Sequence, residues 1–317
     1  ISLVRMLVPL ADFVNHAGQT EALAPLPGCL QTLGLSVADV AFAWTFTTQA
    51  WTRPFEVVRD GLYGQGPMKR LATEFPADMT LMDMRDAAPA GENPKILANE
   101  LFMPMAKGLY AEFGATNKPD ELAMFFDNFD FIDFHVLGTI DSPQFFQRFD
   151  DAGKQLPLTD QVWRLDPHSG EAFVRHEGVN FWLMVPKFRK GPAPVAIFVH
   201  GHGSTKFDAM NFAGFLARQG IATMGIDAVS HGVDVEPILQ QLVLAQFQGK
   251  GIKAMGEAIL AGRALDQNAD GKLDSGVDFW TSYIFHTRDV VRQTAVDIMQ
   301  ICRTLGSFDG VTRWHHD

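Results

Sequence analysis

The sequence predicts an α/β fold with a mostly parallel sheet, preceded by a smaller N-terminal region of strands and helices. Pro194–Ser204 has an apolar strand pattern that runs directly into the glycine-rich turn His-Gly-His-Gly-Ser. A second apolar run, Ile221–Asp227, follows a stretch with helical spacing, Asp208–Gln219. Because strand, helix and strand in this order form a crossover unit, we expect the two strands to be parallel. The first strand is apolar on both faces and is therefore expected in the middle of the sheet.

The chain divides by pattern into an accessory region, residues 1–128, and a main sheet region, residues 129–317. In the accessory region Val40–Thr48 alternates in the manner of a half-buried strand. Pro54–Gly61 has proline near its start and glycine at its end, which predicts a short helix. The main region opens with two further strand patterns, Phe131–Ile140 and Val179–Pro186.

Two helices have a predicted buried face. In Asp208–Gln219 we expect Phe212, Phe215 and Leu216 to face the core. Thr287–Leu305 is the clearest helix of the chain, with Gly306 at its end. Its apolar residues recur at spacings of three and four: Val291, Ala295, Ile298, Cys302 and Leu305.

The composition excludes several classes of protein. Hydrophobic residues make up 47% of the 317 residues and charged residues 20%, as in ordinary globular proteins. The formal net charge of −11, without any basic run, argues against a nucleic-acid-binding surface. No apolar stretch approaches the roughly 20 residues that cross a bilayer. Cys29 and Cys302 are expected to be buried thiols, with a single disulfide as the alternative.

The turn after the first apolar strand is the main candidate for chemistry. Glycine at 201 and 203 lets the backbone turn sharply and brings N–H groups close to a ligand. In acyl transfer such donors stabilise the oxyanion of the tetrahedral intermediate by about 3–4 kcal/mol each. We expect the backbone N–H of His202 to be the donor, with Gly201 and Gly203 shaping the turn. The alternative is an ordinary glycine turn after a strand.

The loop after the second strand, Asp227–Gly232, carries Ser230 and His231. Neighbouring side chains diverge, so these two are not expected to form a Ser–His pair; a polar loop at the rim of the site is favoured. A metal site formed by His200, His202 and His231 is a weaker alternative, because no carboxylate pattern accompanies the histidines.

The segment 266–274 resembles a calcium loop. Oxygen side chains stand at loop positions 1, 3, 5 and 9, glycine stands at position 6, and position 7 contributes only its carbonyl. The predicted ligands are Asp266, Asn268, Asp270, Lys272 (through its backbone) and Asp274. The closing glutamate of such loops is replaced by Val277, with Asp278 next to it. The alternative is a surface loop held by its own Asx turns.

Taken together, these segments resemble a group of large bacterial α/β-hydrolases of the lipase/esterase kind, which are usually exported. The matching pieces are Ala43–Gln49, Arg59–Gly64, Val136–Pro143, Phe181–Pro186, Ile197–Gly203, the 266–274 loop with Gly276–Trp280, and Thr287–Thr294. The resemblance implies an α/β-hydrolase-like sheet over 129–317, incomplete and preceded by the accessory region. It also implies an extracellular or periplasmic location.

The chain departs from that group in one respect. No Gly-x-Ser-x-Gly nucleophile motif occurs, and in Gly306–Gly310 the serine is not the middle residue. We therefore expect the nucleophile, acid and base to lie outside this chain, in the remaining C-terminal part of the same hydrolase or in another polypeptide. The alternative is that this fragment is inactive by itself.

Two functions follow as hypotheses. The first is a carboxylic ester hydrolase that acts by Ser-His-acid acyl transfer on an ester or lipid-like small molecule, with a structural Ca²⁺. The second is a non-catalytic binding or assembly module that retains the hydrolase framework.

Overall fold

A computed structural model describes residues 21, 23–40, 43, 52–113, 119–267 and 270–308. Contacts divide the chain into two units, Ile1–Thr52 and Arg53–Asp317. The first unit contains α3 (Leu26–Thr32) and the short 3-10 helix η1 (Val37–Asp39). Most of the strand expected over residues 40–48 lies outside the described residues. The boundary expected after residue 128 falls inside the second unit, near the end of α7 (Pro119–Phe129).

The second unit is built on a six-stranded sheet with the order β1-β3-β4-β6-β5, in which β2 also pairs with β3. Its strands are β1 (Thr80–Leu81), β2 (Leu97–Ala98), β3 (Ile132–Gln144), β4 (Arg175–Pro186), β5 (Val195–Val199) and β6 (Ala222–Ile226). Every pairing except β5–β6 is antiparallel. The fold is therefore mixed α/β with a mostly antiparallel sheet.

This topology contradicts the mostly parallel, α/β-hydrolase-like sheet predicted from the sequence. Parallel neighbours need a crossover connection. In the described part of the chain, a single α-helix joins two paired strands only once, where α8 (Met210–Arg218) joins β5 to β6. Strands β2 and β3 are joined by two helices, α6 (Asn99–Phe113) and α7, and pair antiparallel. The longest pair, β3 with β4, runs antiparallel from Ile132↔Pro186 to Gln144↔Arg175.

Strand β5 pairs in parallel with β6, as expected, but it does not lie in the middle of the sheet. In the described part of the chain it is the last strand of the sheet, with Val195 and Val199 more than a third exposed. Its apolar sequence therefore reflects partial cover by helices and not a central position.

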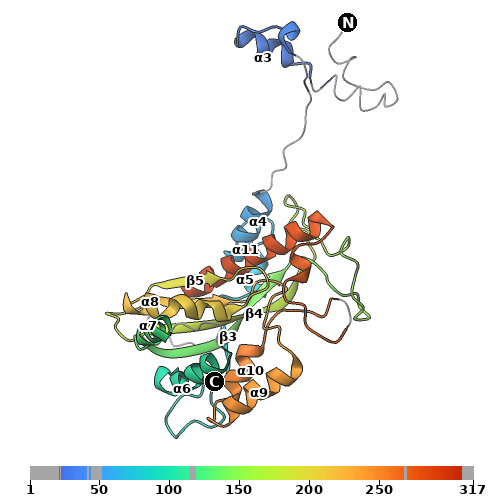
Figure 1. Ribbon diagram of the computed structural model, residues 1–317. Coiled ribbons are helices and arrows are strands. Elements are labelled where there is room, and N and C mark those ends of the chain that lie inside the picture. The colour runs from blue at the N-terminus through green and yellow to red at the C-terminus, as the bar shows by residue number, and fades with distance from the viewer. Residues whose placement is uncertain are drawn as a thin grey trace. The chain divides into compact units, whose positions relative to one another are not determined.

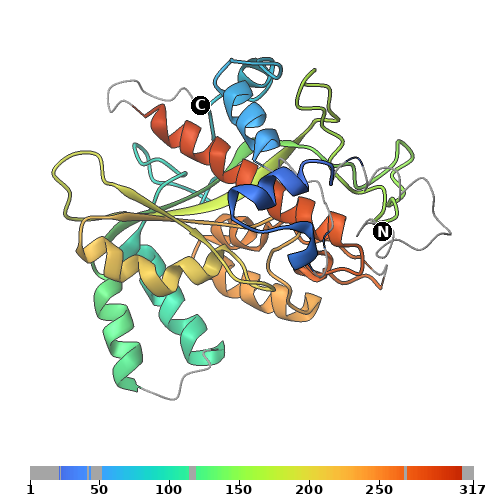
Figure 2. The same ribbon diagram turned by 90° about the horizontal axis from the view of Figure 1, so that it is seen from above.

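Helices cover both faces of the sheet (Figures 1 and 2). One face packs against α4 (Arg53–Leu62), α5 (Leu71–Glu74) and α11 (Ile284–Gly306). The other packs against α6 (Asn99–Phe113), α7, α8, α9 (Pro237–Gln248) and α10 (Lys253–Leu260). Because successive strand residues point to opposite faces, Val136 joins the α11 side and Leu137 the α6 side.

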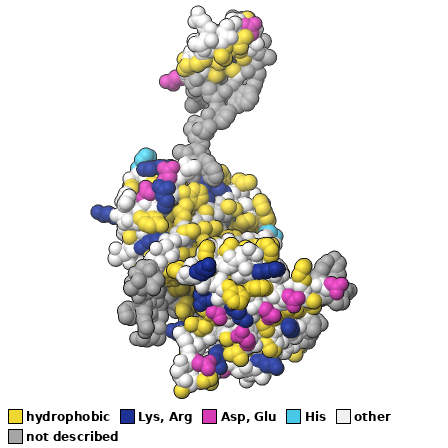
Figure 3. Space-filling model, turned by 90° about the vertical axis from the view of Figure 1, so that its left-hand side faces the viewer, with side chains coloured by type: hydrophobic (Ala, Val, Ile, Leu, Met, Phe, Trp, Pro, Cys, Tyr) yellow, Lys and Arg dark blue, Asp and Glu magenta, His cyan; other side chains and the backbone are white. Residues whose placement is uncertain are grey.

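Helix α8 turns a different face inward from the one predicted. Phe212 and Phe215 are 50% and 61% exposed, whereas the small residues Ala213, Gly214 and Ala217 are buried. A Cβ on Gly214 would lie 2.7 Å from the backbone carbon of Asn128, so α8 approaches α7 too closely for larger side chains. Figure 3 shows the side of the molecule on which α7 and α8 lie, where hydrophobic side chains gather among charged ones.

Helix α11 is longer than predicted, and its most buried residues are largely polar. Val291 is 47% exposed, while Gln293, Asp297 and Gln300 are fully buried. Cys302 on this helix and Cys29 in the first unit are free and exposed, so their expected burial was wrong. None of the described helices is long and apolar enough to span a bilayer.

Candidate functional site

The His200–Gly203 turn lies at the carboxyl end of β5. Gly201, His202 and Gly203 are exposed. The turn is closed by Ser204 N–H, which donates to the Gly201 carbonyl over 3.2 Å, and Gly203 adopts φ 72°. Within the described residues, the N–H groups of His202 and Gly203 donate to no acceptor. These two amides are therefore available as donors, and oxyanion binding by the His202 N–H stays a prediction.

His200 is fully hydrogen-bonded. Its Nε2 accepts from the backbone N–H of Ala228 over 3.0 Å, so the proton lies on Nδ1, which donates to the Gly201 carbonyl over 2.8 Å. Both nitrogens are used in holding the turn against the end of β6. His200 positions the turn and has no lone pair left for a ligand.

His231 has one unused nitrogen. Its ring lies 4.9 Å from that of His200 and 5.9 Å from that of His202, between centroids. Nδ1 donates to the Val229 carbonyl over 2.8 Å, while the buried Nε2 has no hydrogen-bond partner. Burial lowers the pKa of His231 below its ordinary value, with a smaller contribution from the two neighbouring histidines. The neutral ring therefore keeps a free acceptor at Nε2.

The three histidines do not form a metal site. The lone pair of His200 is occupied, and His202 Nε2 donates to the Gly276 carbonyl over 3.0 Å. Over the described ranges, no three His, Cys, Asp or Glu side chains are arranged to hold a metal ion.

Gly276 connects the turn to the loop that follows β6. Its N–H donates to the Ser230 carbonyl over 2.8 Å, and its carbonyl accepts from His202. It adopts φ 75°, and a Cβ there would lie 2.5 Å from His231 Nε2 and 3.2 Å from Gly203 N. Only glycine adopts this positive φ without strain and leaves room for the His231 ring and the Gly203 amide. Sequence analysis assigned this residue no role, because a glycine beside an acidic loop is an ordinary turn signal.

Ser230 is buried, not at an exposed rim as expected. It is fully inaccessible and adopts φ 62°, which is uncommon for a residue with a side chain. Its Oγ donates to Asp278 Oδ2 over 2.7 Å and accepts from Arg148 over 2.5 Å. The structure shows no hydrogen bond between the Ser230 and His231 side chains, as expected for neighbours. Ser230 is therefore not accessible as a nucleophile.

Asp278 is an ionised carboxylate in a buried position. Burial alone would raise its pKa, but the nearby His286 ring, the charge of Arg148 and the Ser230 hydroxyl outweigh burial and hold the pKa below its ordinary value. His286 Nε2 lies 3.5 Å from Asp278 Oδ2, and its Nδ1 donates to the Gln161 carbonyl over 2.7 Å. The Arg148–Ser230–Asp278–His286 chain thus connects four separate segments.

A buried ion pair and a largely buried cluster of three charged side chains lie near the turn. Lys206 Nζ lies 2.7 Å from Asp227 Oδ2, with both side chains fully buried. Arg263 lies 2.6 Å from Asp297 and 2.7 Å from Glu177. Lys206, in the 3-10 helix η2 (Lys206–Ala209), is thereby tied to the end of β6, and Arg263 ties the segment after α10 to α11 and β4. Sequence analysis missed Lys206 and Arg263, since a lone basic residue is more often exposed.

The acidic loop satisfies most of its described carboxylates internally. Asp266 accepts from the N–H groups of Asp270 and Gly271, and Asp274 accepts from the N–H of Gln267 over 2.8 Å. Lys272 Nζ pairs with Glu236 at 2.6 Å, so only its backbone faces the loop. Asn268 lies outside the described residues. These contacts match the Asx-turn alternative, and calcium binding stays a prediction.

Comparison with known proteins gives no matching family model, no matching curated protein and no matching solved structure. The function therefore has to be inferred from the site itself.

Proposed function

We propose that the turn at Gly201–Gly203 binds the oxyanion in a carboxylic ester hydrolase. The observation that carries this proposal is the pair of N–H groups on the exposed residues His202 and Gly203, at the carboxyl end of β5, which lack an acceptor within the described part of the chain. Preorganised backbone donors of this kind contribute about 3–4 kcal/mol each to the stability of a tetrahedral intermediate.

The substrate is an ester or lipid-like small molecule, and the nucleophilic serine comes from outside these 317 residues. Two of the serines near the turn have hydroxyls that already donate a hydrogen bond. Ser204 Oγ donates to Asp208 over 2.5 Å, and Ser230 is buried between Arg148 and Asp278. His231, neutral and with Nε2 unpartnered, lies buried beside the turn, its ring 5.9 Å from that of His202. An extracellular or periplasmic location is part of the same proposal.

The test compares two substitutions of His202. His202→Pro removes the backbone N–H, whereas His202→Ala keeps it, and both lose the imidazole contact to Gly276. With a short-chain p-nitrophenyl ester, we expect kcat to fall by about 10²–10³-fold for His202→Pro. We expect His202→Ala to stay within a few-fold of the parent protein. The melting temperature of each variant shows whether the turn has remained folded.

The assay is run on protein of measured intact mass, with and without a serine-directed phosphonate. Turnover that the phosphonate blocks, on a chain longer than these residues, supports the ester hydrolase. Absence of turnover by protein of any length, or equal activity of the two His202 variants, contradicts it. The first of these outcomes favours the non-catalytic binding or assembly module.

A further inference from the structure

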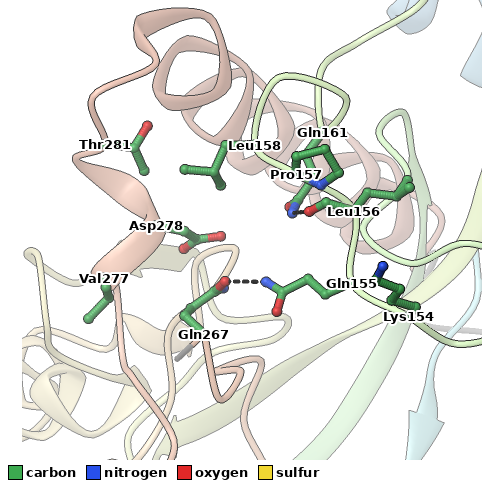
Figure 4. Close-up of a pocket in the computed structure, with 10 residues that line it drawn as sticks. All are labelled: Lys154, Gln155, Leu156, Pro157, Leu158, Gln161, Gln267, Val277, Asp278 and Thr281. Carbon is green, nitrogen blue, oxygen red and sulfur yellow. Dashed lines mark hydrogen bonds between the residues drawn. The ribbon is translucent and has the colours of Figure 1, made fainter. Parts of the chain in front are cut away.

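A pocket lies beside the candidate site (Figure 4). It has a volume of about 500 Å³ and lies between the segment 154–161 and the residues around η3 (Val277–Phe279). Gln155 Nε2 donates to Gln267 Oε1 over 2.5 Å, which joins the two sides of the pocket. Pockets of this size accommodate small organic ligands.

Two buried acceptors in this pocket lack a donor. Asp278 and Gln161 are 2% and 1% exposed, and both line the pocket. Gln161 Nε2 donates to the Leu156 carbonyl over 2.6 Å, which fixes the orientation of its amide and leaves Oε1 unpartnered. Asp278 uses Oδ2 for Ser230 and leaves Oδ1 unpartnered. A buried acceptor without a donor costs about 1–3 kcal/mol, so both atoms favour a ligand that donates hydrogen bonds.

The charges around the pocket favour neutral donors over a cation. The carboxylate of Asp278 already lies close to His286 and shares Ser230 with the Arg148 guanidinium. Lys154 also lines the pocket and would repel an ammonium group. Hydroxyl groups are neutral donors that suit the two unpartnered oxygens.

The remaining wall is apolar. Leu156, Leu158 and Val277 line the pocket, and Figure 4 shows Leu158 and Val277 on the same side as the Asp278 carboxylate. We propose that this pocket binds a small neutral polyhydroxylated molecule the size of a monosaccharide. Its hydroxyls donate to Asp278 Oδ1 and Gln161 Oε1, and its C–H surface packs on Leu158 and Val277.

Saturation-transfer NMR with three probes tests the proposal. Methyl α-D-glucopyranoside supplies hydroxyls and a ring, tetrahydropyran supplies the ring alone, and 1,4-diaminobutane supplies a cation. We expect saturation transfer to the glycoside and none to the other two at millimolar concentrations. No transfer to the glycoside, or equal transfer to tetrahydropyran, overturns the proposal.

Two substitutions place the binding in this pocket. Asp278→Asn turns an amide donor toward the ligand and is expected to weaken glycoside binding at least tenfold. Since Asp278 also supports Ser230, a second variant avoids the hydrogen-bond network: Val277→Trp fills the pocket from a residue that is 55% exposed. We expect Val277→Trp to abolish the signal without lowering the melting temperature. Its matched control is Leu242→Trp on α9, 54% exposed and outside the lining, which should bind normally.

Glycoside binding by this pocket does not depend on the proposed ester hydrolysis, because the experiment measures binding and not turnover. His202→Pro should leave glycoside binding unchanged, and Val277→Trp binding at the parent level overturns the pocket assignment alone.

Discussion

Gly276 shows how one residue without a side chain can hold a site together. Three neighbours contact it. The Gly276 N–H donates to Ser230, the Gly276 carbonyl accepts from His202, and the His231 ring packs closely against the Gly276 backbone. Because its φ is 75°, an L-residue would also be strained there.

We expect Gly276→Ala to lower the free energy of unfolding by about 2–4 kcal/mol, from the left-handed backbone and the overlap with His231. Urea denaturation measures the change. Gly108→Ala in α6 is the control, because Gly108 has nothing within 4 Å of an added Cβ and lacks a positive φ. It should stabilise the helix by about 0.5–1 kcal/mol. Equal effects of the two substitutions would show that the contacts of Gly276 are unimportant.

At the residue scale, sequence patterns locate the turn but not its surroundings. His200–Gly203 follows a strand as predicted, because an apolar run followed by glycines is a local signal. Tertiary packing brings distant residues to Ser230. Arg148 is 82 residues away in the sequence and Asp278 is 48 residues away, and His286 joins them through Asp278. No spacing in the sequence encodes such a meeting.

At the element scale, the three helices predicted by residue, α4, α8 and α11, lie where they were predicted, but α8 and part of α11 turn other residues inward. On α11 the predicted Ile298 and Leu305 do pack against the core. The prediction placed the large apolar side chains of α8 and α11 in the core. Instead α8 buries Ala213, Gly214 and Ala217, and α11 buries Gln293 and Asp297. Asp297 accepts from Ser142 and Arg263, so the polar stripe of α11 is hydrogen-bonded to the sheet. Apolar periodicity does not detect a buried face that is satisfied by hydrogen bonds.

The acidic loop gives a prediction at this scale. We expect the melting temperature to fall on chelation of calcium, and Asp270→Ala to remove that dependence. At a calcium concentration a hundred times the dissociation constant, the ion adds about 2.7 kcal/mol of stability. Asp151→Ala, an exposed acid elsewhere, should keep the response. If chelator does not change the melting temperature of the parent protein, the calcium prediction is wrong and the loop is held by its Asx turns alone.

At the scale of the whole molecule, the crossover unit was predicted correctly and its sheet was not. The parallel β5–β6 pair follows from the helix between the strands. The antiparallel pairing of β3 with β4 depends on the long segment 145–174, which has no helix to reverse the direction again. The sequence pattern of a strand does not specify which neighbour it pairs with.

Three buried titratable groups, two histidines and one glutamate, favour their deprotonated forms. Burial lowers the pKa of His135 to about 3 and lowers that of His231 as well. For Glu177 burial acts to raise the pKa, but Arg263, Arg148 and Arg175 outweigh it, so its pKa is lowered. The unfolded chain takes up protons at the ordinary values of 6.5 for histidine and 4.5 for glutamate. Stability from these groups is therefore complete above pH 6.5 and is lost as the pH falls.

We expect the melting temperature to be flat above that pH and to decline steadily toward pH 4. His135→Gln should reduce the decline between pH 6.5 and 4.5, since glutamine can also donate to Asn99 and accept from Trp182. Thermal melts across this range measure the slope, and His168→Gln, at an exposed position, is the control. An unchanged slope in His135→Gln would mean that other groups cause the acid sensitivity.

The outer side of β5 has a consequence for handling the protein. The strand has no charged residue, and its two valines face solvent at the last position of the described sheet. Natural sheets usually protect such rims with lysine, proline or a bulge, because unpaired amides and carbonyls recruit further strands. We therefore expect self-association in concentrated solutions to begin at this strand, and a single lysine in place of Ala196 or Val199 is the smallest change that should reduce it.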